Sequence, residues 1–207
     1  MTDHIKILEL LASKICHDLI SPVGAISNGV EFLEEMGPDA GKEVTDLIAF
    51  SSTQASAKLK AFRMAYGAGG ADTSIKPVDV FNIFEDMIKG DAKVKQNWNP
   101  QDQIGPEDRP PGMTKILMCV LLLTLDCLPK GGTVSVKADG DAILIRAEGE
   151  NGGLKANVQD ALAGSLADVE TKTVHPYVTG LMAKEYGFDI GVAETGTGFA
   201  VFKLQKK

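Results

Sequence analysis

The sequence has little of three features that mark common classes of protein: cysteine, net positive charge and long hydrophobic runs. Its three cysteines, an odd number at irregular spacing, form no disulfide framework and indicate a reducing compartment. A net charge of −7 argues against general binding to nucleic acid. The longest apolar run, residues 116–123, is too short to span a membrane, and the first residues lack the pattern of a signal peptide. We therefore expect a cytoplasmic protein with no nucleic-acid partner and no membrane partner.

A helical pattern fills the first third of the chain. Apolar residues recur there at spacings of three and four, which places them on one stripe of a helix: Leu8, Leu11, Ile15, Leu19, Val23, Ile26, Val30 and Leu33. We expect this helix to end near Met36, with Thr2 or Asp3 as its cap.

A second helix is predicted from about Ala40 to Tyr66, after a turn at Gly37-Pro38-Asp39. Its predicted inner face consists of apolar and small residues: Val44, Leu47, Ile48, Ser51, Ala55, Leu59 and Phe62. Two long helices joined by a short turn predict an antiparallel hairpin. Because a lone hairpin cannot bury both stripes, we expect a homodimer in which two hairpins form a four-helix bundle.

His17 is the most informative residue. It lies about 200° around the helix from both Ile15 and Leu19, so it points away from the apolar stripe. A neutral imidazole is a good nucleophile near neutral pH, and the adjacent Asp18 can orient the proton on its other ring nitrogen. Pro22 has no N–H, so the carbonyl of Asp18 loses its helical partner, and we expect a kink just after His17. The plainer interpretation is a solvated histidine beside a simple kink.

The neighbours of His17 favour phosphoryl transfer over the plainer interpretation. Lys14, one turn earlier on the same side, can attract a phosphoryl group. Ser21 and Gly24 follow one and two turns later, and Gly24 removes bulk where a protein would dock. Ile20 is apolar where a solvated face would be polar, so we expect it to contact a partner. No carboxylate cluster near His17 can hold a metal, so the Mg²⁺ that phosphoryl transfer needs would come from that partner.

One segment resembles a known family: Ile15-Cys16-His17-Asp18-Leu19-Ile20-Ser21-Pro22-Val23-Gly24-Ala25-Ile26. It is similar to the phosphoacceptor helix of two-component histidine kinases and, more closely, to alphaproteobacterial histidine phosphotransferases of the ChpT type. The resemblance implies a dimerising hairpin followed by a domain shaped like a kinase ATP-binding domain that no longer binds ATP. It further implies that His17 takes a phosphoryl group from the receiver domain of a hybrid histidine kinase and passes it to downstream response regulators. No cofactor bound by this chain is implied.

The remainder of the chain alternates element types and predicts a two-layer α/β sandwich, which makes the whole an α+β protein. We expect two domains: a helical hairpin over residues 1–70 and the α/β domain over residues 71–207. Helices are expected at residues 78–89, 113–128, 154–163 and 176–186. Strands are expected at residues 93–98, 133–137, 142–147, 188–192 and 198–204.

Three features that the resemblance predicts for a working ATP site are missing. The helix at residues 113–128 has no asparagine for Mg²⁺, residues 148–153 lack an Asp-x-Gly-x-Gly motif, and residues 171–176 contain no glycine. His175 precedes Pro176, which favours an extended loop, and we expect a structural or solvated role for it. Two alternatives stay open: a sensor histidine kinase core with a divergent ATP site, and a non-enzymatic dimerisation or adaptor module in which His17 is incidental.

Overall fold

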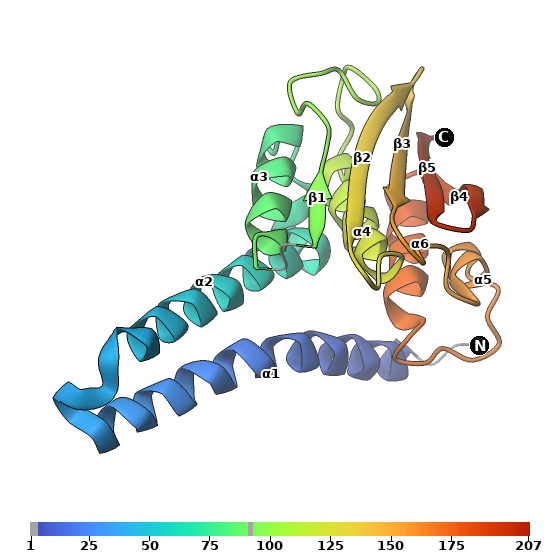
Figure 1. The fold of residues 1–207 in the computed structure, drawn as a ribbon. Helices are drawn as coiled ribbons and strands as arrows, with labels where there is room; N and C mark the ends of the chain where they lie inside the picture. Colours follow the sequence, from blue (N-terminus) through green and yellow to red (C-terminus); the bar gives the residue numbers. More distant parts are fainter. Residues whose placement is uncertain (1–3, 91–92) are drawn as a thin grey trace.

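A long helical hairpin opens the structure, a computed structural model that describes residues 4–90 and 93–207. Helix α1 (His4–Met36) and helix α2 (Gly41–Tyr66) are joined by one 3-10 turn, η1 (Gly37–Ala40). The turn is possible because Gly37 and Gly41, with φ of 54° and 74°, adopt left-handed backbone that other residues avoid. The hairpin projects from the rest of the molecule as an arm (Figure 1). The predicted caps, Thr2 and Asp3, lie outside the described residues.

The apolar stripes of the hairpin are only partly covered. Close packing occurs at Gly29, where a β-carbon would come within 2.6 Å of the Ile48 side chain. Several residues of the two predicted apolar faces are 41–66% exposed: Leu8, Val23, Val30, Leu47 and Leu59. Within one chain, the opposite helix therefore does not bury Leu47 and Leu59. Two helices in contact shield only a narrow strip of each other, so a wide stripe keeps an open flank.

A five-stranded mixed sheet forms one layer of the α/β domain. In chain order its strands are β1 (Val94–Gln96), β2 (Gly132–Asp139), β3 (Ala142–Glu148), β4 (Phe188–Gly196) and β5 (Phe199–Lys206). Their spatial order is β1-β2-β3-β5-β4, with β1 parallel to β2 and every other pair antiparallel. Buried and exposed residues alternate along β2 and β3, which indicates that the sheet is covered on one face.

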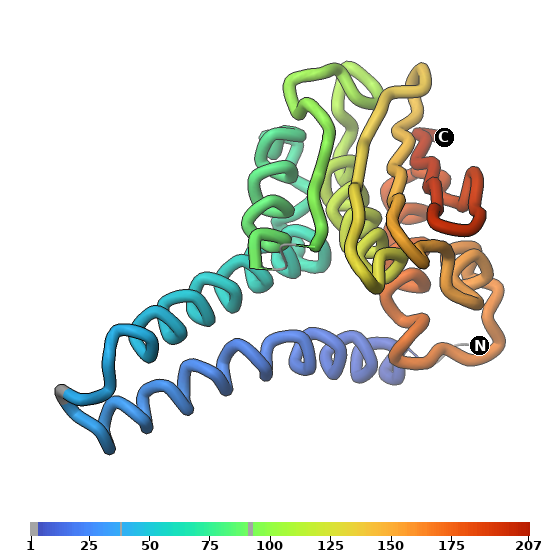
Figure 2. The backbone as a smooth tube through the Cα atoms, in the orientation of Figure 1, coloured from blue at the N-terminus to red at the C-terminus, as the bar shows by residue number. Residues whose placement is uncertain are grey.

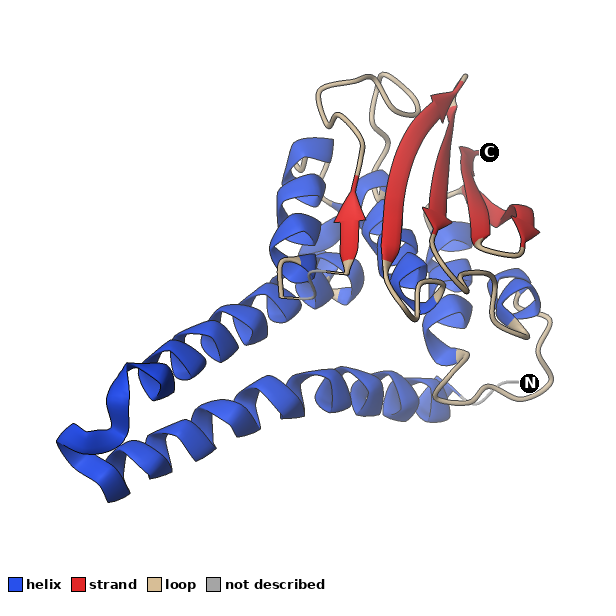
Figure 3. Cartoon of the chain, viewed as in Figure 1, coloured by secondary structure: helices blue, strands red, loops and turns tan. Residues whose placement is uncertain are grey.

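Helices form the second layer (Figure 3). They are α3 (Pro77–Ile88), α4 (Met113–Asp126), α5 (Val158–Ala163) and α6 (Val174–Glu185), preceded by a short 3-10 turn, η2 (Ala68–Ala71). Helix α4 is buried along almost its whole length, as its nearly unbroken apolar sequence predicts. Cys119 and Cys127 are buried with it. The predicted two-layer sandwich and α+β class are confirmed.

The hairpin and the α/β domain share a core. Four residues of the last turns of α2, Ala61, Phe62, Met64 and Ala65, belong to the same buried cluster as α4 and the sheet. The other helix also touches the second domain: Ile7 packs with Val169 and Val174, and the tube trace shows the first turns of α1 beside the segment that precedes α6 (Figure 2). His17, ten residues further along α1, is thereby held close to the second domain.

Two local predictions need correction. Helix α5 begins at Val158 rather than at residue 154, because Asn157 adopts a left-handed φ of 64° that interrupts a helix. His175 is not in an extended loop but in the first turn of α6, together with Pro176. A proline is tolerated in a first helical turn because the N–H it lacks would have no helical acceptor there. Within the described residues, no helix combines the length and apolarity needed to cross a bilayer.

Candidate functional site

His17 stands on the open side of α1. Its side chain is 86% exposed, which agrees with its predicted position away from the apolar stripe. The nearest functional group is the neighbouring carboxylate, with His17 Nδ1 3.4 Å from Asp18 Oδ1. When Nδ1–H donates to this carboxylate, Nε2 keeps its lone pair and is free to attack an electrophile.

Asp18 is held more firmly than the imidazole beside it. Lys14, one helical turn earlier, places its Nζ 3.3 Å from Asp18 Oδ2, and both side chains are about 70% covered. The Asp18 carbonyl, left without its helical donor by Pro22, accepts a hydrogen bond of 2.8 Å from Lys58 Nζ on α2. Pro22 itself is buried, and α1 continues through it as one helix. Asp18, whose carboxylate faces His17, is therefore held both at its side chain and at its main chain.

The surface beyond His17 is open and contains the other predicted site residues. Ile20 is 70% exposed, although it is a large apolar side chain. Ser21 is also exposed, and a β-carbon on Gly24 would meet no atom within 4 Å. The structure therefore brings His17, Asp18 and Lys14 together, and it leaves Ile20, Ser21 and Gly24 as a free surface next to them.

The second domain contributes to a pocket at His17, which we call the His17 pocket. It has a volume of about 470 Å³. Its lining residues come from α1, from the end of α4 and from the loops before α5 and α6: Lys14, His17, Asp18, Asp126, Lys155, Thr171 and Lys172. Lys155 Nζ lies 2.9 Å from Asp126 Oδ1, so each carboxylate in the pocket already has a lysine partner. The third lysine of the pocket, Lys172, gives the lining one more positive charge than it has carboxylates.

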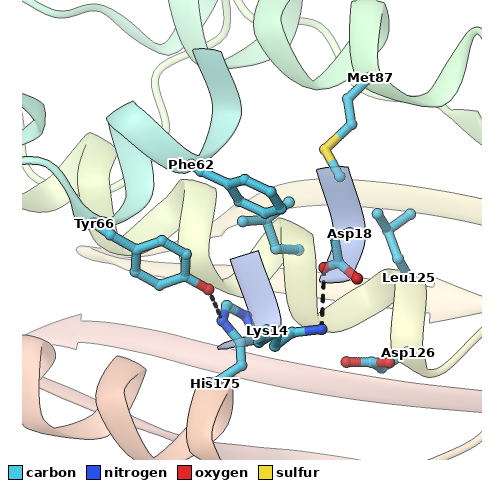
Figure 4. Close-up of a pocket in the computed structure, with 9 residues that line it drawn as sticks. Lys14, Asp18, Phe62, Tyr66, Met87, Leu125, Asp126 and His175 are labelled. Atoms are coloured by element: carbon cyan, nitrogen blue, oxygen red, sulfur yellow. Dashed lines mark hydrogen bonds and ion pairs between the residues drawn. The ribbon is translucent and has the colours of Figure 1, made fainter. Parts of the chain in front are cut away.

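A second pocket, of about 210 Å³, lies at the junction of hairpin and second domain (Figure 4). There the Tyr66 hydroxyl donates to His175 Nδ1, and His175 Nε2–H donates to the main-chain carbonyl of Cys119 at 3.0 Å. Burial lowers the pKa of His175 to about 4, so its ring is neutral at neutral pH. Burial also raises the pKa of the Tyr66 phenol. Both ring nitrogens of His175 are engaged, so the predicted structural role is confirmed.

Two further hydrogen bonds hold the end of α2 against α4. The Lys115 ammonium donates to the Gly67 carbonyl at 2.6 Å, and the Cys119 thiol donates to the Ala65 carbonyl at 3.4 Å. Burial lowers the pKa of Lys115 and raises the pKa of Cys119 to about 12. The thiol is therefore a buried structural group and not a nucleophile.

The segments compared above with the motifs of a kinase ATP site carry ordinary structural contacts. Glu148, which follows the middle strand, pairs with Arg146 at 2.9 Å. Thr124 on α4 is buried and donates to the Leu121 carbonyl. The glycines of the Gly196–Gly198 turn connect β4 to β5. Across residues 4–90 and 93–207, no three His, Cys, Asp or Glu side chains are grouped so that they could hold a metal ion.

Several residues at the site were missed by sequence analysis. Lys58, Asp126, Lys155 and Lys172 reach the site from elements far along the chain. The sequence contains one signal for them, the carbonyl of Asp18 that Pro22 leaves without a donor. It does not indicate which side chain supplies the hydrogen bond.

An exposed imidazole with a carboxylate at one ring nitrogen, presented on a helical hairpin, is the arrangement of a protein that carries a phosphoryl group. The profile of the family described as histidine phosphotransferase C-terminal domain matches residues 78–198. The chain is 33% identical to the protein phosphotransferase ChpT of Brucella abortus (strain 2308) over 193 residues, which are 90% of this chain and 89% of that protein. A solved structure described as a bacterial phosphotransferase superposes with a TM-score of 0.80 at 30% identity, covering 99% of this chain and 98% of that one.

The chain therefore belongs to the histidine phosphotransferase family. Its role is phosphoryl transfer in a phosphorelay, with kinases and response regulators as the general class of partner.

Proposed function

We propose that His17 is the phosphoryl carrier of this phosphotransferase, and the observation that carries the proposal is the Nδ1 contact to a fixed Asp18. Nε2 attacks the phosphorus of an aspartyl phosphate on a receiver domain; the N–P bond forms while the P–O bond breaks, and the aspartate leaves as a carboxylate. The ring keeps its Nδ1 proton and gains positive charge, which the Asp18 carboxylate stabilises. The return step, to the aspartate of a response regulator, reverses these changes.

The receiver domain is proposed to bring the Mg²⁺ that neutralises the transferring group, with no cofactor held by this chain. Ile20, Ser21 and Gly24 would contact the receiver, because they form the open surface next to His17. The second domain would add the lysines of the His17 pocket, whose positive charge suits an anionic phosphorylation site. In this view the second domain supports docking and does not bind ATP.

We also propose that the protein is a cytoplasmic homodimer, built from a hairpin domain over residues 1–70 and an α/β domain over residues 71–207. Exposed apolar residues on both hairpin helices supply the surface that a four-helix bundle would cover. The three cysteines are free thiols, in keeping with a reducing compartment.

The test is phosphoryl transfer to purified wild type and His17→Gln. Each is incubated with labelled ATP alone, and then with a labelled, phosphorylated receiver domain and Mg²⁺. We expect label on the wild type from the receiver only, and none on the variant. Label from ATP alone would support the kinase alternative, and no label on His17 from a panel of receivers would support the adaptor alternative.

A further inference from the structure

Pro22 creates a defect in α1 one residue from the phosphoacceptor. In a regular helix the N–H of residue 22 would donate to the carbonyl of residue 18, and a proline both removes that N–H and pushes the carbonyl aside. An unpaired carbonyl in a partly covered position is costly, so the group needs another donor. The structure supplies one from the other helix of the hairpin, at a sequence distance of 40 residues: Lys58 Nζ donates to Asp18 O at 2.8 Å.

We propose that Lys58 is a positioning residue for phosphoryl transfer, which replaces the hydrogen bond that Pro22 removes and thereby fixes Asp18 beside His17. This inference rests on the proposed role of His17. A lysine suits the task because a charged donor forms a stronger hydrogen bond than a neutral one. Its long side chain also reaches from α2 to the displaced carbonyl without requiring the helices to approach closely.

The contacts of Asp18 explain why this bond matters for the imidazole. Three groups hold the residue: Lys58 at the main-chain oxygen, Lys14 at Oδ2 and the His17 ring at Oδ1. The last contact, at 3.4 Å, is at the long end of the hydrogen-bond range, so a small rotation of the backbone would break it. Without Lys58, the Asp18 carbonyl loses its hydrogen bond to α2, the backbone at Asp18 is free to rotate, and the carboxylate no longer holds Nδ1–H in place.

A purely structural role of Lys58 predicts a different dependence on the residue at position 22. If Lys58 only joined the two helices, its removal would cost stability whatever stands at position 22. If Lys58 replaces the missing helical bond, its importance must depend on the proline. Pro22→Ala restores an N–H that can donate to the Asp18 carbonyl, so in that background Lys58 should become dispensable for transfer.

The experiment is a double-mutant cycle with Lys58→Met, Pro22→Ala and the double variant. Lys60→Met serves as a matched control, because Lys60 lies on the same helix but lines a separate pocket with Arg63 and Gly67. The rate constant of transfer from a phosphorylated receiver is measured over a range of receiver concentrations, and melting temperature is recorded in parallel. Potassium phosphoramidate, a small phosphoryl donor, provides labelling of His17 that does not depend on receiver docking.

We expect Lys58→Met to lower the limiting transfer rate about tenfold, the size of effect typical for one charged hydrogen bond, without raising the half-saturating receiver concentration. Lys58→Arg should restore the rate. In the Pro22→Ala background the same Lys58→Met change should cost less than about twofold. Labelling by phosphoramidate should fall in parallel with the limiting rate.

Two results would overturn the inference: an unchanged transfer rate in Lys58→Met, with or without a fall in melting temperature, or an equal loss of rate in both backgrounds. A different result would refute the proposed role of His17 itself, namely a wild-type protein that neither phosphoramidate nor any receiver labels at His17. The two failures are therefore distinguishable.

Discussion

Asp18 is the residue on which the proposed chemistry of His17 depends most directly. The imidazole of His17 is 86% exposed, and its described polar contact is the Asp18 carboxylate, which Lys14 holds. An exposed ring can meet a receiver domain, but it needs a neighbour to keep the proton on Nδ1. A carboxylate one residue away meets that need and leaves the approach to Nε2 open.

Asp18→Asn removes the negative charge while keeping the shape of the side chain. We expect transfer from a phosphorylated receiver to fall by about 10²-fold, because the carboxylate no longer stabilises the positive charge that develops on the ring. Single-turnover kinetics measure this rate. Asp46→Asn, an exposed aspartate on α2 that pairs with Lys42, is the control and should leave the rate unchanged. A wild-type rate in Asp18→Asn would contradict the role given to Asp18.

His175 predicts a pH dependence of stability. Its pKa is lowered by burial from 6.5 to about 4, so between these values the unfolded chain binds a proton that the folded chain does not. The stability contribution is complete above about pH 6.5 and is lost as the pH falls towards 4, with a slope of at most about 1.4 kcal/mol per pH unit. Urea unfolding of the wild type and His175→Gln at several pH values measures it. Between about pH 4 and 6.5, the free energy of unfolding of His175→Gln should depend less on pH than that of the wild type. The same pH dependence in both proteins would contradict the low pKa of His175.

At the scale of residues, the sequence predicts which groups are reactive better than it predicts their hydrogen-bond partners. The exposure of His17, the proximity of Asp18 and the orphan carbonyl of Asp18 all follow from helical geometry within eight residues. The donor to that carbonyl, Lys58, depends on the register between two helices, which spacing along one helix does not contain. For His175, the predicted structural role is correct, but the predicted extended conformation is wrong. Proline usually favours an extended conformation in the residue before it, but Pro176 lies in the first turn of α6, where both residues are helical.

At the scale of elements, α1 presents an open surface next to His17, the proposed phosphoacceptor. Ile20, 70% exposed, lies one turn after His17 side by side with Ser21 and Gly24. Because the Ile20 side chain is mostly exposed, it contributes little to the stability of the chain on its own. Its energetic contribution is expected in the complex with a receiver domain.

Ile20→Asp should therefore weaken receiver binding without unfolding the chain. We expect the dissociation constant for a receiver domain to rise at least about tenfold, because a charge replaces an apolar contact, while the melting temperature stays within about 2 °C. Calorimetric titration and thermal unfolding measure the two quantities. Ile5→Asp changes an isoleucine of similar exposure (65%) near the N-terminal end of α1 and should leave receiver affinity intact. Equal effects of the two substitutions would argue against a docking surface at Ile20.

The ends of helices are predicted well where the apolar pattern in the sequence is long. The two helices of the hairpin and α4 have many periodic or apolar residues, and their predicted limits agree with the structure within a few residues. Helix α5 is six residues long, and its predicted start was too early by four residues because the left-handed conformation of Asn157 has no strong sequence signal. The exposure of Leu47 and Leu59 shows that a periodic pattern identifies an apolar face but not what covers it.

At the scale of the whole molecule, the hairpin has more apolar surface than one chain covers. Val23, Val30, Leu47 and Leu59 are each at least 41% exposed on the arm that extends from the α/β domain. Apolar residues concentrated in this way on a long hairpin are typical of a surface that a second copy covers.

Replacing two of these residues tests the homodimer. We expect Leu47→Asp with Leu59→Asp to reduce the mass in solution from twice 22.0 kDa to 22.0 kDa, because two charges would be buried at the centre of the bundle. Light scattering coupled to size-exclusion chromatography measures the mass. Thr45→Asp, which changes an exposed polar residue of the same helix, should leave the dimer intact. A wild-type chain of 22.0 kDa at every concentration would contradict the homodimer.

The second domain gives the site its remaining charge. Fixed hydrogen bonds at the end of α2, from Lys115, Cys119 and His175 with Tyr66, hold that domain against the hairpin. As a result, Lys155 and Lys172 line the same pocket as His17, although more than a hundred residues separate them in sequence. Under the proposed function, these two lysines form part of the surface on which a receiver domain docks.

The most direct test of the central claim is to identify the phosphorylated atom. The chain, labelled with ¹⁵N at its histidines, is incubated with a phosphorylated receiver domain and Mg²⁺, and ³¹P–¹⁵N couplings are recorded by NMR. The account predicts one phosphoryl group, attached to Nε2 of His17, with the proton retained on Nδ1. A phosphoryl group on His4 or His175, on Nδ1 of His17, or on no histidine at all would contradict it.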